Sequence, residues 1–256
     1  MCYNIIVTRK GHNMNFDEAK RFVQERFLMI DEKLLYDALI YSDEDEVGFE
    51  KDDEQCNLYR KLKDEIGASW FEFGCSKIVF GFSELEDYVV KLPLFGQWIE
   101  KYDKYTDDYY IVFDEYNNAN SEHNSNDYCH KESEVYKLLQ EDGLEGLAFG
   151  THFLFSVDGV PVYMSEMCEN CGLTTSKCFP SVSEESQKKG HQKSMDSGYI
   201  MYDDMISVFI EQHGENMTDK MLEFISKYGV RDFHNGNVGY DSNGRIRMID
   251  YSGFDC

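Results

Sequence analysis

The stretch that decides the predicted fold is Tyr228-Gly229-Val230-Arg231-Asp232-Phe233-His234-Asn235-Gly236-Asn237-Val238-Gly239-Tyr240, followed closely by Arg245-Ile246-Arg247-Met248-Ile249-Asp250. Asp232 precedes Asn237 by five residues. Two short apolar runs come next, and the residues between them, Asp241-Ser242-Asn243-Gly244, are typical of a turn that closes a β-hairpin. The sequence therefore predicts a carboxylate and an amide before a hairpin, and a second carboxylate at the end of that hairpin.

These residue types suit phosphoryl transfer. An ionised aspartate only accepts hydrogen bonds, so Asp232 is a candidate base for a hydroxyl proton. Mg²⁺ prefers hard oxygen ligands, which the Asn237 amide and the Asp250 carboxylate supply. The alternative is a plain solvated hairpin, because Asp-Gly and Asn-Gly pairs usually mark turns.

Composition indicates an acidic globular protein. The chain has 256 residues, is 42% hydrophobic and 15% aromatic, and carries 25 basic against 49 acidic side chains, a formal charge of −24. Such a surface repels nucleic acids and anionic membranes, so we expect neither as a partner. It either serves solubility or attracts a basic protein partner or substrate segment.

The sequence contains no long apolar stretch of a membrane span and no signal-peptide pattern at its start. Its eight cysteines lack the density of a disulfide scaffold, so we expect reduced thiols and a cytoplasmic protein. Cys168 and Cys171 have the spacing of metal ligands, with Cys178 nearby, but no second pair completes a zinc site. Incidental thiols are the favoured interpretation.

The first part of the chain, residues 1–66, is predicted to be a helical extension packed on the main domain. Apolar residues recur at helical spacing over Phe16–Leu39, with Asn15 and Glu18 arranged as a capping box. A second, mostly solvated helix is expected over Asp52–Ile66.

Strand patterns begin at Ser69. Residues Trp70–Phe82 read as strand, turn and strand, and Tyr88–Pro93 as a third strand that contains Lys91. A lysine in a valine-rich strand requires an anionic partner if it is buried. The alternative is an edge-strand lysine that faces solvent.

Residues 95–127 are acidic and tyrosine-rich, and we interpret them as an insertion or loop with a short strand at Tyr109–Phe113. Helical spacing resumes after this insertion. Glu132 starts a stripe of apolar residues, whereas Glu134 matches that stripe less well. Glu132 is therefore the preferred carboxylate partner of Lys91, with Glu134 as the alternative.

The remaining elements lead to the terminal motif. Strands are expected over Ala148–Val157 and Val160–Met167, joined by an Asp-Gly turn. Residues 170–197 are interpreted as a mobile connection, and helices are expected over Tyr199–Gln212 and Thr218–Tyr228.

From about Ser69 to the last residue, these elements in this order resemble the protein kinase-like superfamily. The Asp-x-His-x-Gly-Asn form is closest in appearance to aminoglycoside-phosphotransferase-like and phage-encoded protein kinases. The resemblance implies an α+β, two-lobe kinase-like fold. Its expected parts are an N-terminal extension at 1–66, an N-lobe at 67–168 with the insertion near 95–127, and a reduced C-lobe at 169–256.

The resemblance implies a role for each matching residue. Asp232 would be the catalytic base, and Lys91, oriented by Glu132, would hold the phosphates of ATP. Asn237 and Asp250 would bind Mg²⁺. The expected nucleotide-binding residues are those of the phosphate-covering turn, Gly74, Cys75, Ser76 and Lys77, and those beside adenine, Glu166, Met167 and Cys168.

The implied function is ATP- and Mg²⁺-dependent phosphotransfer to a protein Ser/Thr hydroxyl in the cytoplasm, that of the host if the chain is phage-encoded. The turn carries one glycine where the family has several, Val230 stands where a histidine is usual, and the sequence stops at Cys256, soon after the metal-binding position. Three alternatives therefore stay open. They are an inactive kinase-like module that binds a protein through its acidic surface, a small-molecule kinase, and a nucleotide transferase.

Overall fold

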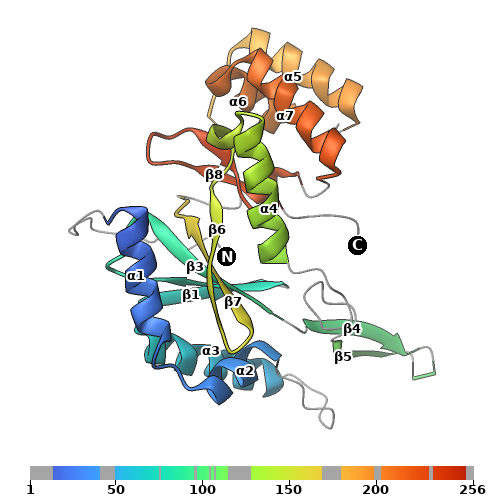
Figure 1. Ribbon diagram of the computed structural model, residues 1–256. Coiled ribbons are helices and arrows are strands. Elements are labelled where there is room, and N and C mark those ends of the chain that lie inside the picture. Colours follow the sequence, from blue (N-terminus) through green and yellow to red (C-terminus); the bar gives the residue numbers. More distant parts are fainter. Residues whose placement is uncertain are drawn as a thin grey trace. The chain divides into compact units, whose positions relative to one another are not determined.

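The computed structural model describes residues 14–40, 50–74, 76–94, 97–103, 105–106, 108–114, 128–168, 180–198, 203–230 and 233–251. Helices and antiparallel strands occur together, so the fold belongs to the α+β class (Figure 1). The chain divides into two compact units. The sheet unit contains the described residues up to Lys131 together with Thr151–Glu166, and the helical unit contains Glu132–Gly150 and the described residues from Met167 onward. Within the described ranges, no helix is long and apolar enough to cross a membrane.

The sheet unit combines helices with a five-stranded antiparallel sheet in the order β1-β2-β3-β7-β6. Strand β3 therefore lies in the middle of the sheet. A separate hairpin pairs β4 with β5. The elements are α1 (Phe16–Phe27), α2 (Glu32–Ile40), α3 (Glu50–Ile66), β1 (Trp70–Phe73), β2 (Lys77–Gly81), β3 (Tyr88–Pro93), β4 (Gln97–Asp103), β5 (Asp108–Asp114), β6 (Thr151–Val157) and β7 (Val160–Glu166).

Local signals set the helix ends of this unit. The predicted capping box is confirmed, because Glu18 N–H donates to Asn15 Oδ1 at 3.1 Å and Asn15 N–H donates to the Glu18 carboxylate at 3.0 Å. The single helix expected over 16–39 is instead two helices. The Asp31 carboxylate accepts hydrogen bonds from Lys33 N–H at 2.8 Å and Leu34 N–H at 3.2 Å, and so starts α2 separately.

The two faces of the sheet differ. Side chains alternate along each strand, and one face packs with α1, α2 and α3 into a hydrophobic core. That core includes Val90 and Leu92 of β3, which confirms that the N-terminal helices pack on the strands. On the opposite face, Val79, Lys91 and Tyr163 form one row across β2, β3 and β7.

The helical unit holds the terminal motif. Its elements are α4 (Tyr128–Glu141), which belongs to this unit from Glu132 onward, η1 (Glu145–Leu147), α5 (Glu184–Ser197), α6 (Asp203–His213), α7 (Glu215–Tyr228), η4 (Asn235–Asn237), β8 (Val238–Tyr240) and β9 (Ile246–Met248). The predicted terminal hairpin is confirmed, with β8 and β9 antiparallel. Apolar residues from α4, α6, α7 and the hairpin form the core of this unit.

Two parts of the chain differ from the sequence prediction. The insertion, expected as a loop with one strand, contains a second strand, β4, which pairs along the whole of β5. Part of the expected mobile connection is helix α5, while residues 169–179 lie outside the described residues. The face that α5 buries consists of Ser186, Gly190 and Ser194. Because these residues are small and mostly polar, the sequence shows no apolar periodicity there.

Candidate active site

Lys91 is a buried lysine on the central strand of the sheet. Its side chain is 8% exposed, and the residue stands opposite Val79 on one side and Tyr163 on the other. The alternative of an edge-strand lysine facing solvent is therefore wrong. A buried ammonium needs anionic or hydrogen-bonding partners, so the Lys91 side chain must interact with such groups in the folded protein.

The two glutamates proposed as partners of Lys91 have different environments. Glu132 is 1% exposed on α4, whereas Glu134 is exposed. The helical stripe thus identified the inward-facing carboxylate correctly. Lys91 belongs to the sheet unit and Glu132 to the helical unit, so their pairing stays a prediction.

The turn between β1 and β2 is tighter than the expected phosphate-covering loop. Gly74 N–H donates to the Lys77 carbonyl at 3.0 Å, and Leu94 N–H donates to the Ser76 carbonyl at 2.9 Å. The Gly74 N–H is used within the turn, so this group is not free to donate to a phosphate. Cys75 lies outside the described residues.

The buried side chain of Lys77 was not predicted from the sequence. Lys77 was named only as one residue of the phosphate-covering turn, but it is 7% exposed at the start of β2. The alternation of Lys77, Val79 and Gly81 against Ile78 and Phe80 could have shown it, because this alternation places Lys77 on the face of Lys91.

The segment expected beside adenine follows β7. Glu166 ends this strand and stands opposite Tyr88, the first residue of β3. Burial raises the pKa of Tyr88, and the carboxylates of Glu166 and Asp87 raise it further. Cys168 is disulfide-bonded, so the expectation of reduced thiols is wrong for this residue.

The loop before β8 is shaped by His234. Its Nδ1 accepts a hydrogen bond from Gly236 N–H at 2.9 Å, and its carbonyl accepts one from Asn237 N–H at 2.9 Å. A Cβ on Gly236 would lie 2.7 Å from Cε1 of the His234 ring, so only glycine lets the ring take this position. Asp232, the candidate base, lies outside the described residues.

The two candidate metal ligands are linked to each other. The Asn237 side chain is 8% exposed and its amide nitrogen donates to the Asp250 carbonyl at 3.3 Å. The Asn237 carbonyl accepts a hydrogen bond from Ile249 N–H at 2.8 Å. Asp250 has φ of +52°, a left-handed conformation that is uncommon outside glycine. Strained backbone of this kind concentrates at functional sites.

Neighbouring residues hold Asp250 in this conformation. Tyr251 is buried and its hydroxyl donates to the Phe149 carbonyl at 2.7 Å. Phe149 N–H donates to the Met248 carbonyl at 2.9 Å. The guanidinium of Arg247 lies 4.6 Å from the centroid of the Phe149 ring and hydrogen-bonds the Ala148 carbonyl. The chain on either side of Asp250 is therefore fixed by its own hydrogen bonds.

Side chains at the end of helix α6 hydrogen-bond to the turn and to strand β9 of the terminal hairpin. The Gln212 side chain accepts from Ile246 N–H at 2.7 Å and donates to the Gly244 carbonyl at 3.3 Å. His213 Nε2 donates to the Ile246 carbonyl at 2.7 Å. Burial lowers the pKa of His213, and the hydrogen bond to Ile246 only partly offsets that effect. This contact could not be predicted from the sequence, because the two segments lie far apart along the chain.

The hairpin turn is organised by Asp241. Its carboxylate accepts from Asn243 N–H at 2.8 Å and from Arg245 N–H at 2.9 Å. Burial alone would raise the pKa of Asp241, but these hydrogen bonds and the Arg245 charge together hold it below its usual value. This aspartate is therefore ionised and has a structural role in the turn.

The Asn237–Asp250 pair has the donor chemistry of a Mg²⁺ site. Both side chains offer hard oxygen atoms, and Mg²⁺ in nucleotide sites is commonly held by one or two protein ligands, waters and substrate phosphates. Among the described residues, no group of three or more His, Cys, Asp or Glu side chains could hold a metal ion. A Mg²⁺ site made of Asn237, Asp250 and nucleotide phosphates would contain only one side chain of these four types.

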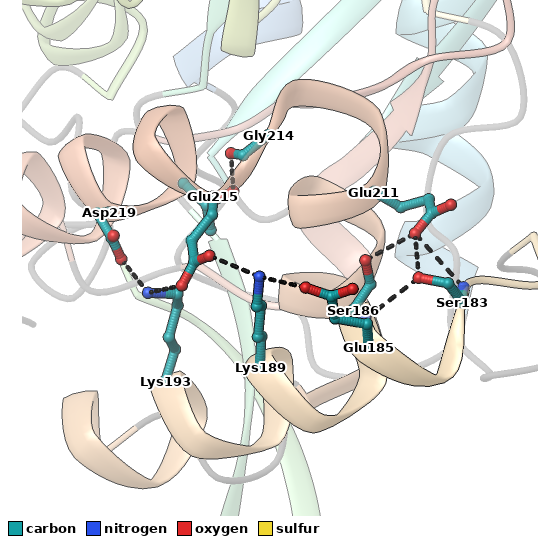
Figure 2. A network of polar contacts seen from close by, with 10 residues as sticks. Ser183, Glu185, Ser186, Lys189, Lys193, Glu211, Gly214, Glu215 and Asp219 are labelled. Carbon is teal, nitrogen blue, oxygen red and sulfur yellow. Dashed lines mark hydrogen bonds and ion pairs between the residues drawn. The ribbon is translucent and has the colours of Figure 1, made fainter.

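A second polar cluster joins the three C-terminal helices (Figure 2). Lys189 contacts Glu185 at 2.7 Å and Glu215 at 2.9 Å, and Lys193 contacts Glu215 at 3.2 Å and Asp219 at 2.5 Å. Hydrogen bonds with Glu185 and Glu215 raise the pKa of Lys189. These contacts tie α5 to α7, so we interpret this cluster as structural.

The other end of the same cluster ties α5 to α6. The Glu211 carboxylate accepts from the Ser183 hydroxyl at 2.8 Å and from the Ser186 hydroxyl at 2.6 Å (Figure 2). Hydrogen bonds from these two serines lower the pKa of Glu211. Ser183 also caps α5 by accepting from Ser186 N–H at 3.2 Å.

Comparison with known proteins adds no relative. The sequence matches no protein-family model, and neither the curated proteins nor the solved structures provide a match. The candidate site therefore stands on the geometry of its own residues.

Proposed function

We propose that this chain is an ATP- and Mg²⁺-dependent phosphotransferase of the protein kinase-like type, which phosphorylates Ser or Thr hydroxyls of a protein. The observation that carries the proposal is the link between Asn237 and Asp250. The Asn237 side-chain nitrogen donates to the main-chain carbonyl of Asp250 across the base of the hairpin, and both residues carry side-chain oxygens of the kind that Mg²⁺ prefers.

The buried charges of α4 and β3 support the same function. Kinases use a lysine on the third strand of the sheet to hold the nucleotide phosphates, and a helix glutamate to orient it. Lys91 lies on β3 and Glu132 on α4, and both are almost fully buried. Buried charged residues of this kind are enriched at functional sites.

The remaining roles follow from the chemistry of phosphoryl transfer. Bound Mg²⁺ would neutralise negative charge on the transferred phosphoryl group, with Asn237 and Asp250 as its protein ligands. Lys91 would position the phosphates by charge-assisted hydrogen bonds. Asp232 would accept the proton of the attacking hydroxyl and orient that oxygen. Most of the catalysis would then come from positioning and charge stabilisation.

The acidic composition favours a basic acceptor. With a formal charge of −24, the surface attracts positively charged segments and repels phosphate-rich ones. The substrate class we propose is therefore a protein with Ser or Thr near basic residues, and a nucleic acid acceptor is disfavoured.

Incubation with γ-labelled ATP, Mg²⁺ and a basic acceptor protein tests the proposal. The wild type should transfer label, whereas Asp232→Ala and Asp250→Ala should lose about 100-fold or more of the rate. Asp219→Ala, which removes a carboxylate of the structural cluster, is the matched control and should retain activity.

The same assay distinguishes the competing functions. Label transferred from α-labelled ATP would indicate a nucleotide transferase, and label found only on an added small cationic acceptor would indicate a small-molecule kinase. A thermal shift with ATP and Mg²⁺ reports binding without turnover. Neither transfer nor a thermal shift would overturn the proposal and favour a kinase-like module that binds a protein partner.

A further inference from the structure

Two large apolar side chains are exposed at the turn between α1 and α2 (Figure 1). Leu28 is 78% exposed and Met29 is 88% exposed. The residues on either side of them, Phe27 and Ile30, are buried and belong to the hydrophobic core of the sheet unit. The turn is therefore anchored at both ends, and it holds the two apolar side chains out in the solvent.

Hydrogen bonds fix the chain before and after the exposed pair. Leu28 N–H donates to the Gln24 carbonyl at 3.0 Å, which completes the last turn of α1. Asp31 N–H donates to the Glu65 carboxylate of α3 at 2.6 Å. Turns are usually made of polar residues and glycine, and neither exposed side chain adds to the core. Folding therefore does not explain why two large apolar residues stand here.

The helix ends beside this turn carry several exposed carboxylates. Glu25 lies three residues before Leu28, and side chains at this spacing are neighbours on a helix. Asp31 and Glu32 follow the exposed pair at the start of α2, and the hydrogen bond to Asp31 brings Glu65 to the same turn. The apolar pair therefore has carboxylates on both sides of it along the chain.

Basic side chains offset this negative charge only in part. Arg26 contacts Glu84 at 3.2 Å and lies 4.9 Å from the centroid of the Phe22 ring, so its charge is already paired. Lys33 is the one other basic residue in the sequence from 24 to 34. An apolar surface with excess negative charge beside it is complementary to an apolar surface flanked by lysines or arginines. It disfavours an anionic membrane and a second copy of this acidic chain, because like charges repel.

We propose that Leu28 and Met29 are a docking site for a basic amphipathic helix of a partner protein. The apolar face of that helix covers the two side chains, and its lysines or arginines contact Glu25 and Glu32. Amphipathic helices are recognised through apolar anchors three or four residues apart, and the flexible methionine side chain adapts to such a face. None of these residues belongs to the candidate active site, so this docking site is independent of the proposed function.

Fluorescence anisotropy with a labelled helical peptide of leucine and lysine, with all leucines on one face, tests the apolar contact. A matched peptide has alanine in place of leucine and the same charge. The wild type should bind the leucine peptide about 10-fold more tightly than the alanine peptide. Leu28→Ser/Met29→Ser should lose about that factor, because the apolar area is no longer buried. Met195→Ser, at another exposed apolar side chain, should lose none.

A second pair of variants tests the charges. Glu25→Gln/Glu32→Gln should weaken binding of the leucine peptide by about 3- to 10-fold at low salt. The loss should be smaller at high salt, because exposed charges are screened. Glu184→Gln/Glu223→Gln removes the same number of exposed carboxylates from α5 and α7 and should change the affinity by less than about 2-fold. Equal losses in the two variants would show a general attraction by net charge and overturn the assignment to this turn.

The remaining outcomes are equally decisive. Urea unfolding should be the same for all variants, because every substituted side chain is exposed. Equal affinity of the wild type and Leu28→Ser/Met29→Ser for the leucine peptide would overturn the proposal, and so would absence of binding to the wild type. Self-association of the wild type that Leu28→Ser/Met29→Ser abolishes in sedimentation would assign the turn to a second copy instead. These measurements do not involve phosphate transfer, so the proposed function is tested separately.

Discussion

Replacing Asp250 by glycine and by alanine separates its chemistry from its backbone. Asp250 combines a carboxylate, which we propose as a metal ligand, with a left-handed φ of +52°. Both substitutions remove the carboxylate, but only glycine adopts this φ without a steric penalty. We therefore expect the two variants to be equally inactive and unequally stable.

The magnitude follows from the backbone geometry. A non-glycine residue in the left-handed region costs about 1–2 kcal/mol, and glycine loses about 0.4–1 kcal/mol through the greater freedom of the unfolded chain. The difference should leave Asp250→Gly about 0.5–1 kcal/mol more stable than Asp250→Ala. For a chain of this size, that corresponds to a Tm higher by about 1–4 °C.

Urea unfolding and transfer of γ-labelled phosphate, measured on the same preparations, provide the assay. Asp219, inside α7, is the control position, and there the order should reverse, because glycine in a helix is about 1 kcal/mol worse than alanine. Transfer by Asp250→Gly at the wild-type rate would refute the role of the carboxylate. Equal stability of Asp250→Gly and Asp250→Ala would refute the left-handed conformation.

Three further predictions test other parts of the structure. Glu132→Gln should lower phosphate transfer by about 10- to 100-fold while Glu134→Gln leaves it unchanged, because only Glu132 is buried; equal rates in both variants would remove Glu132 from the site. Gly190→Ala should destabilise the protein by about 1–3 kcal/mol in urea unfolding, because its Cβ would lie 2.8 Å from backbone atoms of α6; Gly146→Ala, with no described atom within 4 Å of its Cβ, should cost far less, and equal costs would contradict the close α5–α6 packing. The folded-state pKa of His213 lies below the unfolded value of about 6.5, so below about pH 6.5 the unfolded chain binds more protons than the folded one. The free energy of unfolding should therefore be highest above about pH 6.5 and should fall as the pH drops below that value. His213→Gln should reduce the difference between urea unfolding at pH 7.5 and pH 5.5, and an unchanged difference would show that another group is responsible.

Much of the local structure could be predicted because its causes are local. The capping box at Asn15, the strand Tyr88–Pro93 and the terminal hairpin depend on neighbours within a few residues, and all three are confirmed. Helical periodicity also identified Glu132, and not Glu134, as the inward-facing carboxylate, while the pairing of Glu132 with Lys91 stays a prediction. Helix α5 escaped prediction because its buried face is made of small residues that leave no apolar stripe.

By itself, the sequence determined the order of the candidate residues, the identity of their side chains and the strands and helices that carry them. The tertiary structure decided how deeply these residues are buried and what they contact. Lys91 is in the middle of the sheet because β7, distant along the chain, pairs beside β3. Residue spacing in the sequence likewise does not specify individual hydrogen bonds or backbone angles. Examples are the bond from Gly74 N–H to Lys77, the left-handed φ of Asp250 and the bond from Ile246 N–H to the Gln212 side chain. Periodicity reports which side of an element is apolar, whereas burial and strain depend on the segment that packs against it.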